Sequence, residues 1–327
     1  MESKSAKNAN LLFLTVVGIS LLANIFVSLA SIKGVEINII ANLLVSQVII
    51  LIPGLIFFIT WNKDSTYEKM YKRVRTTTIL LLLVFTWLLM PLVTAANAFS
   101  QLFTTNEVLN ISGEVLDLPL WLMVVIIGII GPFSEEFVFR GLIYRNLRGR
   151  GERYIAASFV SAMFFGLMHM NLNQFCYAFI LGVVFSLINE ILDSTWPSFI
   201  CHALINTQNV FMLYIYDKIL SATSAGGIAE YYNNSIGVEG DSSPQMKLVL
   251  IIMFVVLLFV ALITTSLAIL LLYGISALEG KEDRFKMVFR RNSNAEKVKI
   301  LYFTGYLAIS LCVFVIFLLE PLLKLLK

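Results

Sequence analysis

Long apolar runs alternate with short polar segments along almost the whole chain. A helix that crosses a bilayer needs ~20 mainly apolar residues, because the hydrocarbon core is about 30 Å thick. Runs that reach or approach this length occupy residues 11–32, 37–61, 79–99, 119–143, 154–170, 174–191, 197–216, 248–277 and 300–319. The runs at 154–170 and 174–191 are short and favour a hairpin below full membrane depth. The pattern predicts an all-α, polytopic transmembrane helical bundle of about 8–9 membrane helices.

The composition also indicates a membrane protein and argues against an ordinary soluble domain. Hydrophobic residues make up 58% of the chain and charged residues only 14%, and the mean hydropathy is +0.85. Soluble domains contain roughly 45–50% apolar and about 25% charged residues. The net charge of +3 is too small to indicate a nucleic-acid partner. All three cysteines lie in apolar runs, so they predict small buried side chains and no disulfide framework.

The charges of the loops predict the orientation of the helices. Lys and Arg concentrate before residue 11 and in the loops at 62–78, 145–153 and 278–299, whereas 100–118 and 217–247 are poor in them. Basic loops stay on the cytoplasmic side of a membrane. We therefore expect a multi-pass integral membrane protein with a cytoplasmic N-terminus, in a bacterial plasma membrane. The first apolar run is longer than a typical secretory signal and predicts a retained helix.

A small set of ionisable and amide residues interrupts the apolar runs. Charged groups inside membrane helices are costly and therefore point to functional sites. The set is Glu135, Glu136, Arg140, His169, His202 and Asn206, and its two histidines are the only histidines of the chain. Peptide hydrolysis needs a base that takes a proton from water and donors that stabilise the developing oxyanion. The set contains both kinds of group.

Helical spacing separates the two neighbouring glutamates. Glu136 and Arg140 are i,i+4 and about 40° apart on a helix, with the acid first, which is the order that favours an ion pair. Glu135 points roughly 100° away from Glu136 and has no partner on its own helix. We therefore expect Glu136 and Arg140 to form a structural pair that leaves Glu135 free for chemistry. The alternative is a purely structural role in which Arg140 and Arg145 neutralise both acids.

Three motifs in this region resemble the CPBP (CAAX protease and bacteriocin-processing) family, which includes the type II CAAX prenyl endopeptidases. They are Glu135-Glu136-x-x-x-Arg140, Phe165-x-x-x-His169 and His202-x-x-x-Asn206, in this order along the chain. The resemblance covers about 119–216 and implies an all-helical intramembrane protease that opens toward the cytoplasm. It also implies that Glu135 activates water with help from His169, and that His202 and Asn206 hold the oxyanion.

The resemblance suggests a division of the chain into four parts. These are N-terminal transmembrane helices at 1–112, a catalytic core at 113–216, an outer loop at 217–247 and C-terminal transmembrane helices at 248–327. The outer loop contains Tyr231-Tyr232-Asn233-Asn234-Ser235 and is a candidate lid. Within the core, His202 lies shallower than Glu135, so we expect the segment 192–197 to break its helix and dip into the membrane.

The sequence alone does not decide whether the protein uses a metal or which substrate it acts on. Glu135, His169 and His202 are a candidate three-ligand Zn²⁺ site, although the HExxH motif is absent. If Glu135, His169 and His202 all bound zinc, Glu136 would have to act as the base. That role conflicts with its expected ion pair with Arg140, so we favour a water activated by a glutamate with no obligatory metal. The expected partners are membrane lipid and a peptide or protein substrate that is lipidated or carries a leader. The alternatives are a non-proteolytic immunity or scaffold protein and a proton-coupled transporter.

Overall fold

Helices make up the regular structure of the computed structural model, which describes residues 2–35, 38–61, 70–104, 106, 112–149, 154–223, 227 and 244–289. These residues contain no strand, and the predicted all-α class is confirmed. The longer helices are α1 (Glu2–Ile32), α2 (Ile39–Trp61), α3 (Thr76–Ser100), α9 (Tyr154–Met168), α10 (Leu172–Leu192), α11 (Trp196–Ala222) and α13 (Pro244–Leu278). The shorter ones are α5 (Ser112–Leu116), α6 (Leu120–Met123), η2 (Val124–Ile130), α7 (Gly131–Glu135), η3 (Glu136–Tyr144), α8 (Arg145–Arg148) and α14 (Glu282–Phe289).

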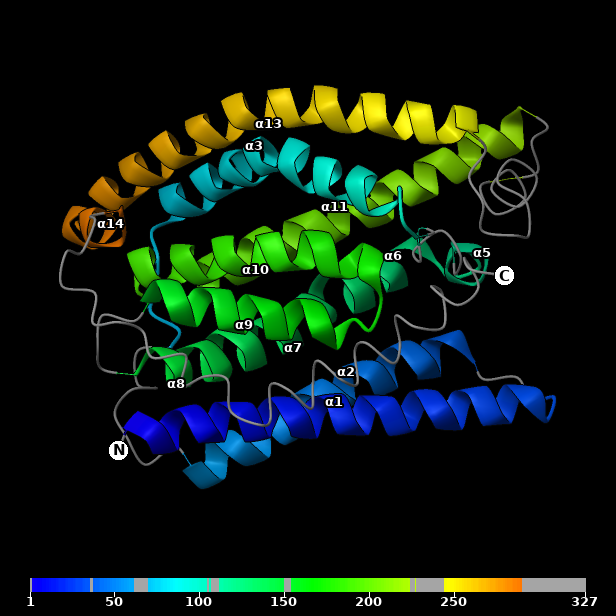
Figure 1. Ribbon diagram of the computed structural model, residues 1–327, viewed down its shortest axis with the longest axis horizontal. Coiled ribbons are helices and arrows are strands. Elements are labelled where there is room, and N and C mark those ends of the chain that lie inside the picture. Colours follow the sequence, from blue (N-terminus) through cyan, green and yellow to red (C-terminus); the bar gives the residue numbers. More distant parts are fainter. Residues whose placement is uncertain are drawn as a thin grey trace.

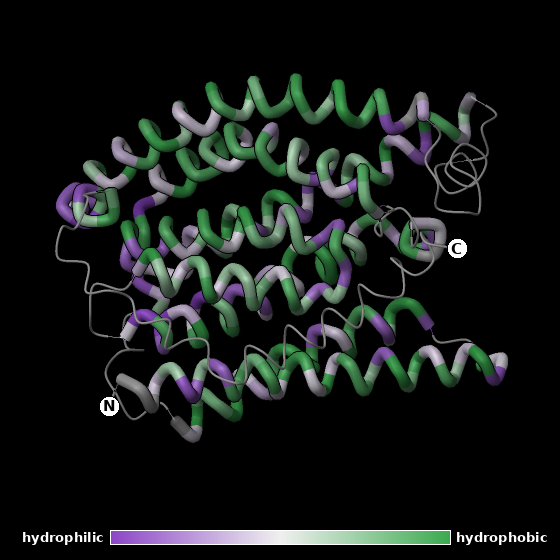
Figure 2. The backbone as a smooth tube through the Cα atoms, in the orientation of Figure 1, coloured by the Kyte–Doolittle hydropathy of each residue, from purple (hydrophilic) through white to green (hydrophobic). Residues whose placement is uncertain are grey.

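The helices follow the apolar runs of the sequence. Eight of the nine predicted runs are helical, whereas the ninth, 300–319, and the candidate lid at 231–235 lie outside the described residues. Six segments are long and apolar enough to cross a membrane: Ser5–Ile32, Ile39–Thr60, Thr76–Ser100, Leu120–Arg148, Leu172–Leu192 and Lys247–Leu278. Figure 2 shows these helices as mainly hydrophobic along their length, with hydrophilic residues gathered toward the ends of the bundle. The chain is an integral membrane protein with several spans.

The bundle has a layered arrangement, and the helices that carry Glu135, Glu136 and His202 form its middle layer. In Figure 1, α13 covers α3 on one side, α1 and α2 form the opposite side, and α9, α10, α11 and the segment from α6 to α8 lie between them. As predicted, α9 and α10 pair as a hairpin, but α10 is long and apolar enough to cross the membrane, so the expectation that both helices stay below full depth was wrong for α10. One apolar core joins α1, α2, η3 and α9, and a second joins α3, α10, α11, α13 and α14.

The membrane span that carries both glutamates departs from regular α-helix. Two stretches of wide π-helix, η2 and η3, flank the short α7. Pro132 has no N–H and cannot bond to the carbonyl of Gly128, and the N–H of Gly131 instead reaches the carbonyl of Ile126, five residues back. π-helical turns are frequent at functional sites. The regular α-helical geometry assumed in the spacing argument for Glu135, Glu136 and Arg140 therefore does not extend through this span, and Pro132 lies where η2 meets α7.

A tight turn separates α10 from α11 and sets the start of the helix that carries His202. Asp193 adopts a left-handed conformation with φ 47° and ends α10. The N–H of Thr195 donates to the carbonyl of Met70 at 2.8 Å, which ties the turn to the segment before α3. The predicted break within 192–197 is therefore present. α11 then continues to Ala222, so the first residues of the predicted outer loop at 217–247 are helical.

Candidate active site

Glu136 and Arg140 form the ion pair that their spacing predicts. Nη1 of Arg140 lies 3.0 Å from Oε1 of Glu136, and the two side chains are 0% and 1% exposed. Two aromatic rings surround the guanidinium carbon of Arg140, at 4.1 Å from the ring centre of Phe165 and 5.4 Å from that of Phe185. Stacking on aromatic faces stabilises a guanidinium that has been removed from water. The pair therefore forms a closed, charge-balanced unit where η3 meets α9 and α10.

His202 joins both glutamates to α11. Its Nδ1 lies 2.9 Å from Oε1 of Glu136, which is a hydrogen-bond distance. Its Nε2 lies 3.6 Å from Oε2 of Glu135, which is too long for a direct hydrogen bond but within ion-pair distance. The two nitrogens of one imidazole thus face two adjacent carboxylates. Because Nδ1–H donates its hydrogen bond to the carboxylate of Glu136, Nε2 is the nitrogen available to a reacting group.

Glu135 is the more accessible of the two acids. Its side chain is 13% exposed, against 1% for Glu136. The sequence predicts that Glu135 has no partner on its own helix, and its ionic contact is with His202 on a different helix.

His169 lies at the tip of the α9–α10 hairpin, directly after the last residue of α9. Its Nδ1 lies 2.9 Å from the carbonyl oxygen of Phe165. That carbonyl can only accept, so Nδ1 carries the proton and Nε2 is left with a lone pair. Its ring packs edge-on against Phe165, with the centres 5.1 Å apart. The Phe165-x-x-x-His169 spacing therefore fixes both the orientation and the tautomer of this imidazole.

Asn206 follows His202 by one turn of α11 and bonds to the backbone of the π-helix. Its Nδ2 donates to the carbonyl of Ile127 at 3.2 Å. Close packing makes this contact possible, since a Cβ added to Gly128 would lie 2.5 Å from the Thr207 hydroxyl. One amide hydrogen of Asn206 is used in this way, and the amide carries a second donor hydrogen.

Ser198 and Asn189, which were not among the predicted site residues, connect α10 to the first turn of α11, next to His202. Ser198 lies one turn before His202 and is fully buried. Its hydroxyl accepts from Nδ2 of Asn189 at 2.7 Å, and its backbone N–H donates to Oδ1 of Asn189 at 3.2 Å. The Ser198 hydroxyl itself donates to the carbonyl of Thr195 at 3.1 Å. The i,i+4 series of Ser198, His202 and Asn206 was visible in the sequence and could have identified Ser198.

A second polar cluster ties the basic ends of the helices together. Glu190, near the end of α10, accepts two hydrogen bonds from Arg148, from Nε at 2.8 Å and from Nη2 at 2.5 Å, and one from the Tyr144 hydroxyl at 2.9 Å. Asp193 pairs with Lys72 and, at 3.3 Å, with Arg284. Burial raises the pKa of Asp193, but its bond from Lys72 and the charge of Arg284 outweigh burial and hold this pKa below its usual value. The cluster fixes the α10–α11 turn and with it the start of α11.

The candidate zinc ligands are not assembled as a metal site. Glu135 and His202 are close, but the described part of the chain brings no three His, Cys, Asp or Glu side chains together in a group that could hold a metal. The set Glu135, His169 and His202 does not fit a three-ligand site in this conformation. We therefore derive no chemical step through a metal.

The helical membrane bundle and its Glu–His–Asn cluster define a candidate membrane hydrolase, and comparisons with known proteins agree with this class. Residues 117–208 match the family described as "Type II CAAX prenyl endopeptidase Rce1-like". A curated relative is the "Putative membrane peptidase YdiL" of Bacillus subtilis (strain 168), 28% identical over 91 residues, which cover 28% of this chain and 37% of that protein. The chain thus matches little more than a third of the relative's length. No solved structure matches the chain.

The matched segment contains every predicted site residue, from Glu135 to Asn206. The resemblance to the CPBP family that the three motifs predict is confirmed over this segment.

Proposed function

We propose that this protein is an intramembrane endopeptidase that hydrolyses a peptide bond near the cytoplasmic face with a water activated by Glu135. The observation that carries the proposal is the arrangement of Glu135 and Glu136 on the two nitrogens of His202, inside a membrane bundle. A partly accessible carboxylate beside an oriented imidazole is what general-base activation of water requires. The match to a peptidase family supports the same class of reaction.

The proposed reaction proceeds in two steps, attack of water on the scissile carbonyl and collapse of the tetrahedral intermediate. A water between Glu135 and the scissile carbonyl gives its proton to Glu135 while its oxygen bonds to the carbonyl carbon. The carbonyl electrons move onto oxygen, and Nε2–H of protonated His202 and the second N–H of Asn206 stabilise the resulting charge. When the intermediate collapses, the C–N bond breaks and the leaving nitrogen takes the proton that Glu135 had accepted. His169 assists by holding or relaying a proton through its free Nε2.

The charges of the site are compatible with these roles. Two carboxylates and one guanidinium leave one negative charge in a site where Glu136 and Arg140 are almost fully buried. One additional proton, shared between Glu135 and His202, makes the group of Glu135, Glu136, Arg140 and His202 neutral. Proton movement between these groups during the reaction therefore changes no net charge inside the membrane, where an uncompensated charge is costly.

The proposed substrate is a peptide or protein that is lipidated or carries a leader, and membrane lipid is the second partner. The basic loops favour a cytoplasmic N-terminus. His202 is only six residues into α11 and ~9 Å along it from the end that faces the basic cluster. The site is thus closer to that face than to the other, which favours cleavage near the cytoplasmic side.

The test is the detection of a cleaved product in detergent. Purified full-length protein is incubated with lipidated and leader-containing peptides, and products are identified by mass spectrometry beside Glu135→Ala and the control Glu282→Ala, which removes a carboxylate of α14 remote from the site. We expect products from wild type and Glu282→Ala only, and no loss of activity on prolonged chelation. Equal cleavage by Glu135→Ala would overturn the proposal. Activity seen only with an ion gradient across vesicles would favour a transporter instead.

A further inference from the structure

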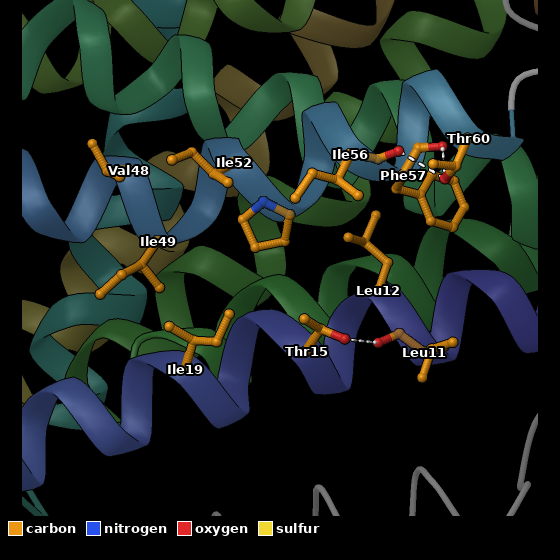
Figure 3. A pocket seen from close by; sticks show the side chains of 11 residues that line it. Leu11, Leu12, Thr15, Ile19, Val48, Ile49, Ile52, Ile56, Phe57 and Thr60 are labelled. Carbon is orange, nitrogen blue, oxygen red and sulfur yellow. Dashed lines mark hydrogen bonds between the residues drawn. The ribbon is translucent and has the colours of Figure 1, made fainter.

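An apolar groove runs between α1 and α2 on the side of the bundle away from α13. Its volume is about 480 Å³, within the roughly 300–1,000 Å³ typical of small-molecule sites. Figure 3 shows side chains of the two helices facing each other across it. The groove is lined by Leu11, Leu12, Thr15, Ile19, Val48, Ile49, Ile52, Pro53, Ile56, Phe57 and Thr60.

Each wall of the groove is a ridge of residues spaced by four. The series Leu11, Thr15 and Ile19 forms one wall, and every fourth residue from Val48 to Thr60 forms the other. Residues three and four apart share one face of a helix. The wall residues are exposed on the surface of the protein, whereas Leu12, Pro53 and Phe57 are buried and form the floor.

Both walls of the groove are anchored to the core of the bundle, and α1 and α2 also contact each other. The Phe13 ring of α1 stacks on Phe164 of α9 with centres 4.0 Å apart, and the Ser5 hydroxyl bonds to Asn146. On α2, a Cβ added to Gly54 would lie 2.6 Å from a methyl group of Val138, so this helix packs directly on η3. Closing the groove would require α1 or α2 to give up these contacts.

The lining has no polar group that needs a partner in the groove. The Thr15 hydroxyl donates to the carbonyl of Leu11 at 2.9 Å, and the Thr60 hydroxyl donates to that of Ile56 at 2.7 Å. Both threonines are thus satisfied within their own helices. The complementary ligand is a flexible hydrocarbon chain without polar groups along its length.

The length and the charge at one end of the groove identify the kind of lipid. From Val48 to Thr60 the groove extends ~18 Å along α2, close to the ~15 Å depth of one leaflet. Lys7 is exposed and precedes Leu11 by one helical turn, so it lies on the same face of α1 as Leu11 and Thr15. We propose that the groove binds one anionic phospholipid, with an acyl chain between α1 and α2 and the phosphate beside Lys7.

A lipid chain of the substrate is a poorer occupant of this groove. The opposite face of α2 packs on α7 and η3, through contacts such as that of the Phe58 ring with Phe137 at 6.0 Å. α2 therefore stands between the groove and Glu135. A chain in the groove is separated from the scissile bond by a whole helix, so the site is distinct from the proposed active site and does not depend on the proposed function.

The proposal is tested by lipid-dependent melting of the purified full-length protein. Delipidated protein in detergent is titrated with phosphatidylglycerol or with phosphatidylcholine of the same acyl chains, and bound lipid is counted by native mass spectrometry. We expect one retained phosphatidylglycerol and a larger rise in Tm with it than with phosphatidylcholine. Equal shifts with the two headgroups would overturn the assignment of an anionic lipid.

Two pairs of variants locate the lipid. Thr15→Trp fills the groove and should abolish the bound lipid and its Tm shift, whereas Val256→Trp, on the exposed face of α13, should retain both. Lys7→Gln should remove the preference for phosphatidylglycerol, whereas Lys33→Gln, at the other end of α1, should not. A Thr15→Trp protein that melts as a folded protein and still binds the lipid as wild type does would overturn the groove as the site.

Discussion

Oε1 of Glu136 lies 2.9 Å from Nδ1 of His202, and this contact connects the ion-paired π-helix to the helix that carries the proposed oxyanion donors. The same oxygen lies 3.0 Å from Arg140. Glu136 therefore has two functions: it neutralises a buried guanidinium, and it orients an imidazole so that Nε2 faces Glu135. The spacing of the sequence predicts only the first.

The first prediction concerns the stability that Glu136 provides. Glu136→Gln leaves Arg140 buried without its counter-charge, and breaking such a pair typically costs ~3–5 kcal/mol. We expect a lower melting temperature and lower yield in detergent. The double change Glu136→Gln/Arg140→Met should recover part of the loss, because replacing a whole buried pair by neutral groups removes the unpaired charge. A Glu136→Gln protein as stable as wild type would contradict this account of the pair.

The second prediction separates two roles of Asn206. Loss of its hydrogen bond to Ile127 should cost about 1 kcal/mol of stability, and loss of an oxyanion donor typically lowers kcat by about 10²–10³. Asn206→Ala should therefore melt slightly earlier and, per folded molecule, turn over at least tenfold more slowly. Stability and turnover of the same preparation are to be compared. A loss of stability with unchanged turnover would mean that Asn206 only joins α11 to η2.

The third prediction concerns Ser198 as a positioning residue. Its hydroxyl accepts from Asn189 of α10 and donates to the carbonyl of Thr195, one turn before His202. Ser198→Ala removes this link between α10 and the first turn of α11, so we expect slower turnover and a shifted pH profile of kcat, because the helix segment that positions His202 is loosened. Ser198→Thr keeps the hydroxyl and should restore the wild-type profile. If Ser198→Ala lowers stability alone and leaves the pH profile unchanged, the residue only packs the helix.

Much of the fold could be predicted from the sequence, because membrane helices are specified by local runs of apolar residues. The pairing of Glu136 with Arg140 could be predicted for the same reason, since both lie within one turn. Contacts between helices could not be predicted in this way. The spacing of residues within one helix does not indicate that Asn189 bonds to Ser198 or that both carboxylates lie next to His202. The π-helical turns around Pro132 were also missed, because the helical wheel assumes a constant rise and rotation per residue.

The fourth prediction is an acid-dependent loss of stability at the α10–α11 turn. The pKa of Asp193 is lowered in the folded protein, so its ion pairs contribute fully above the unfolded value of ~3.9 and are lost as pH falls through the lower folded value. Asp193→Asn also tolerates the left-handed backbone and should reduce stability at neutral pH while flattening its fall in acid. Melting curves between neutral pH and pH ~3 check this, with the exposed Asp283→Asn as control. Parallel pH dependences of wild type and Asp193→Asn would contradict the prediction.

The most direct test of the proposed chemistry compares turnover per folded molecule in Glu135→Gln and Glu136→Gln. Glu135 is the accessible acid and makes no ion pair with Arg140, so Glu135→Gln should melt close to wild type and show no detectable cleavage. Glu136→Gln should be less stable, and its remaining folded fraction should retain measurable cleavage, reduced by the loosened His202. A stable but inactive Glu136→Gln together with an active Glu135→Gln would reverse the two roles and contradict the assignment of Glu135 as the base.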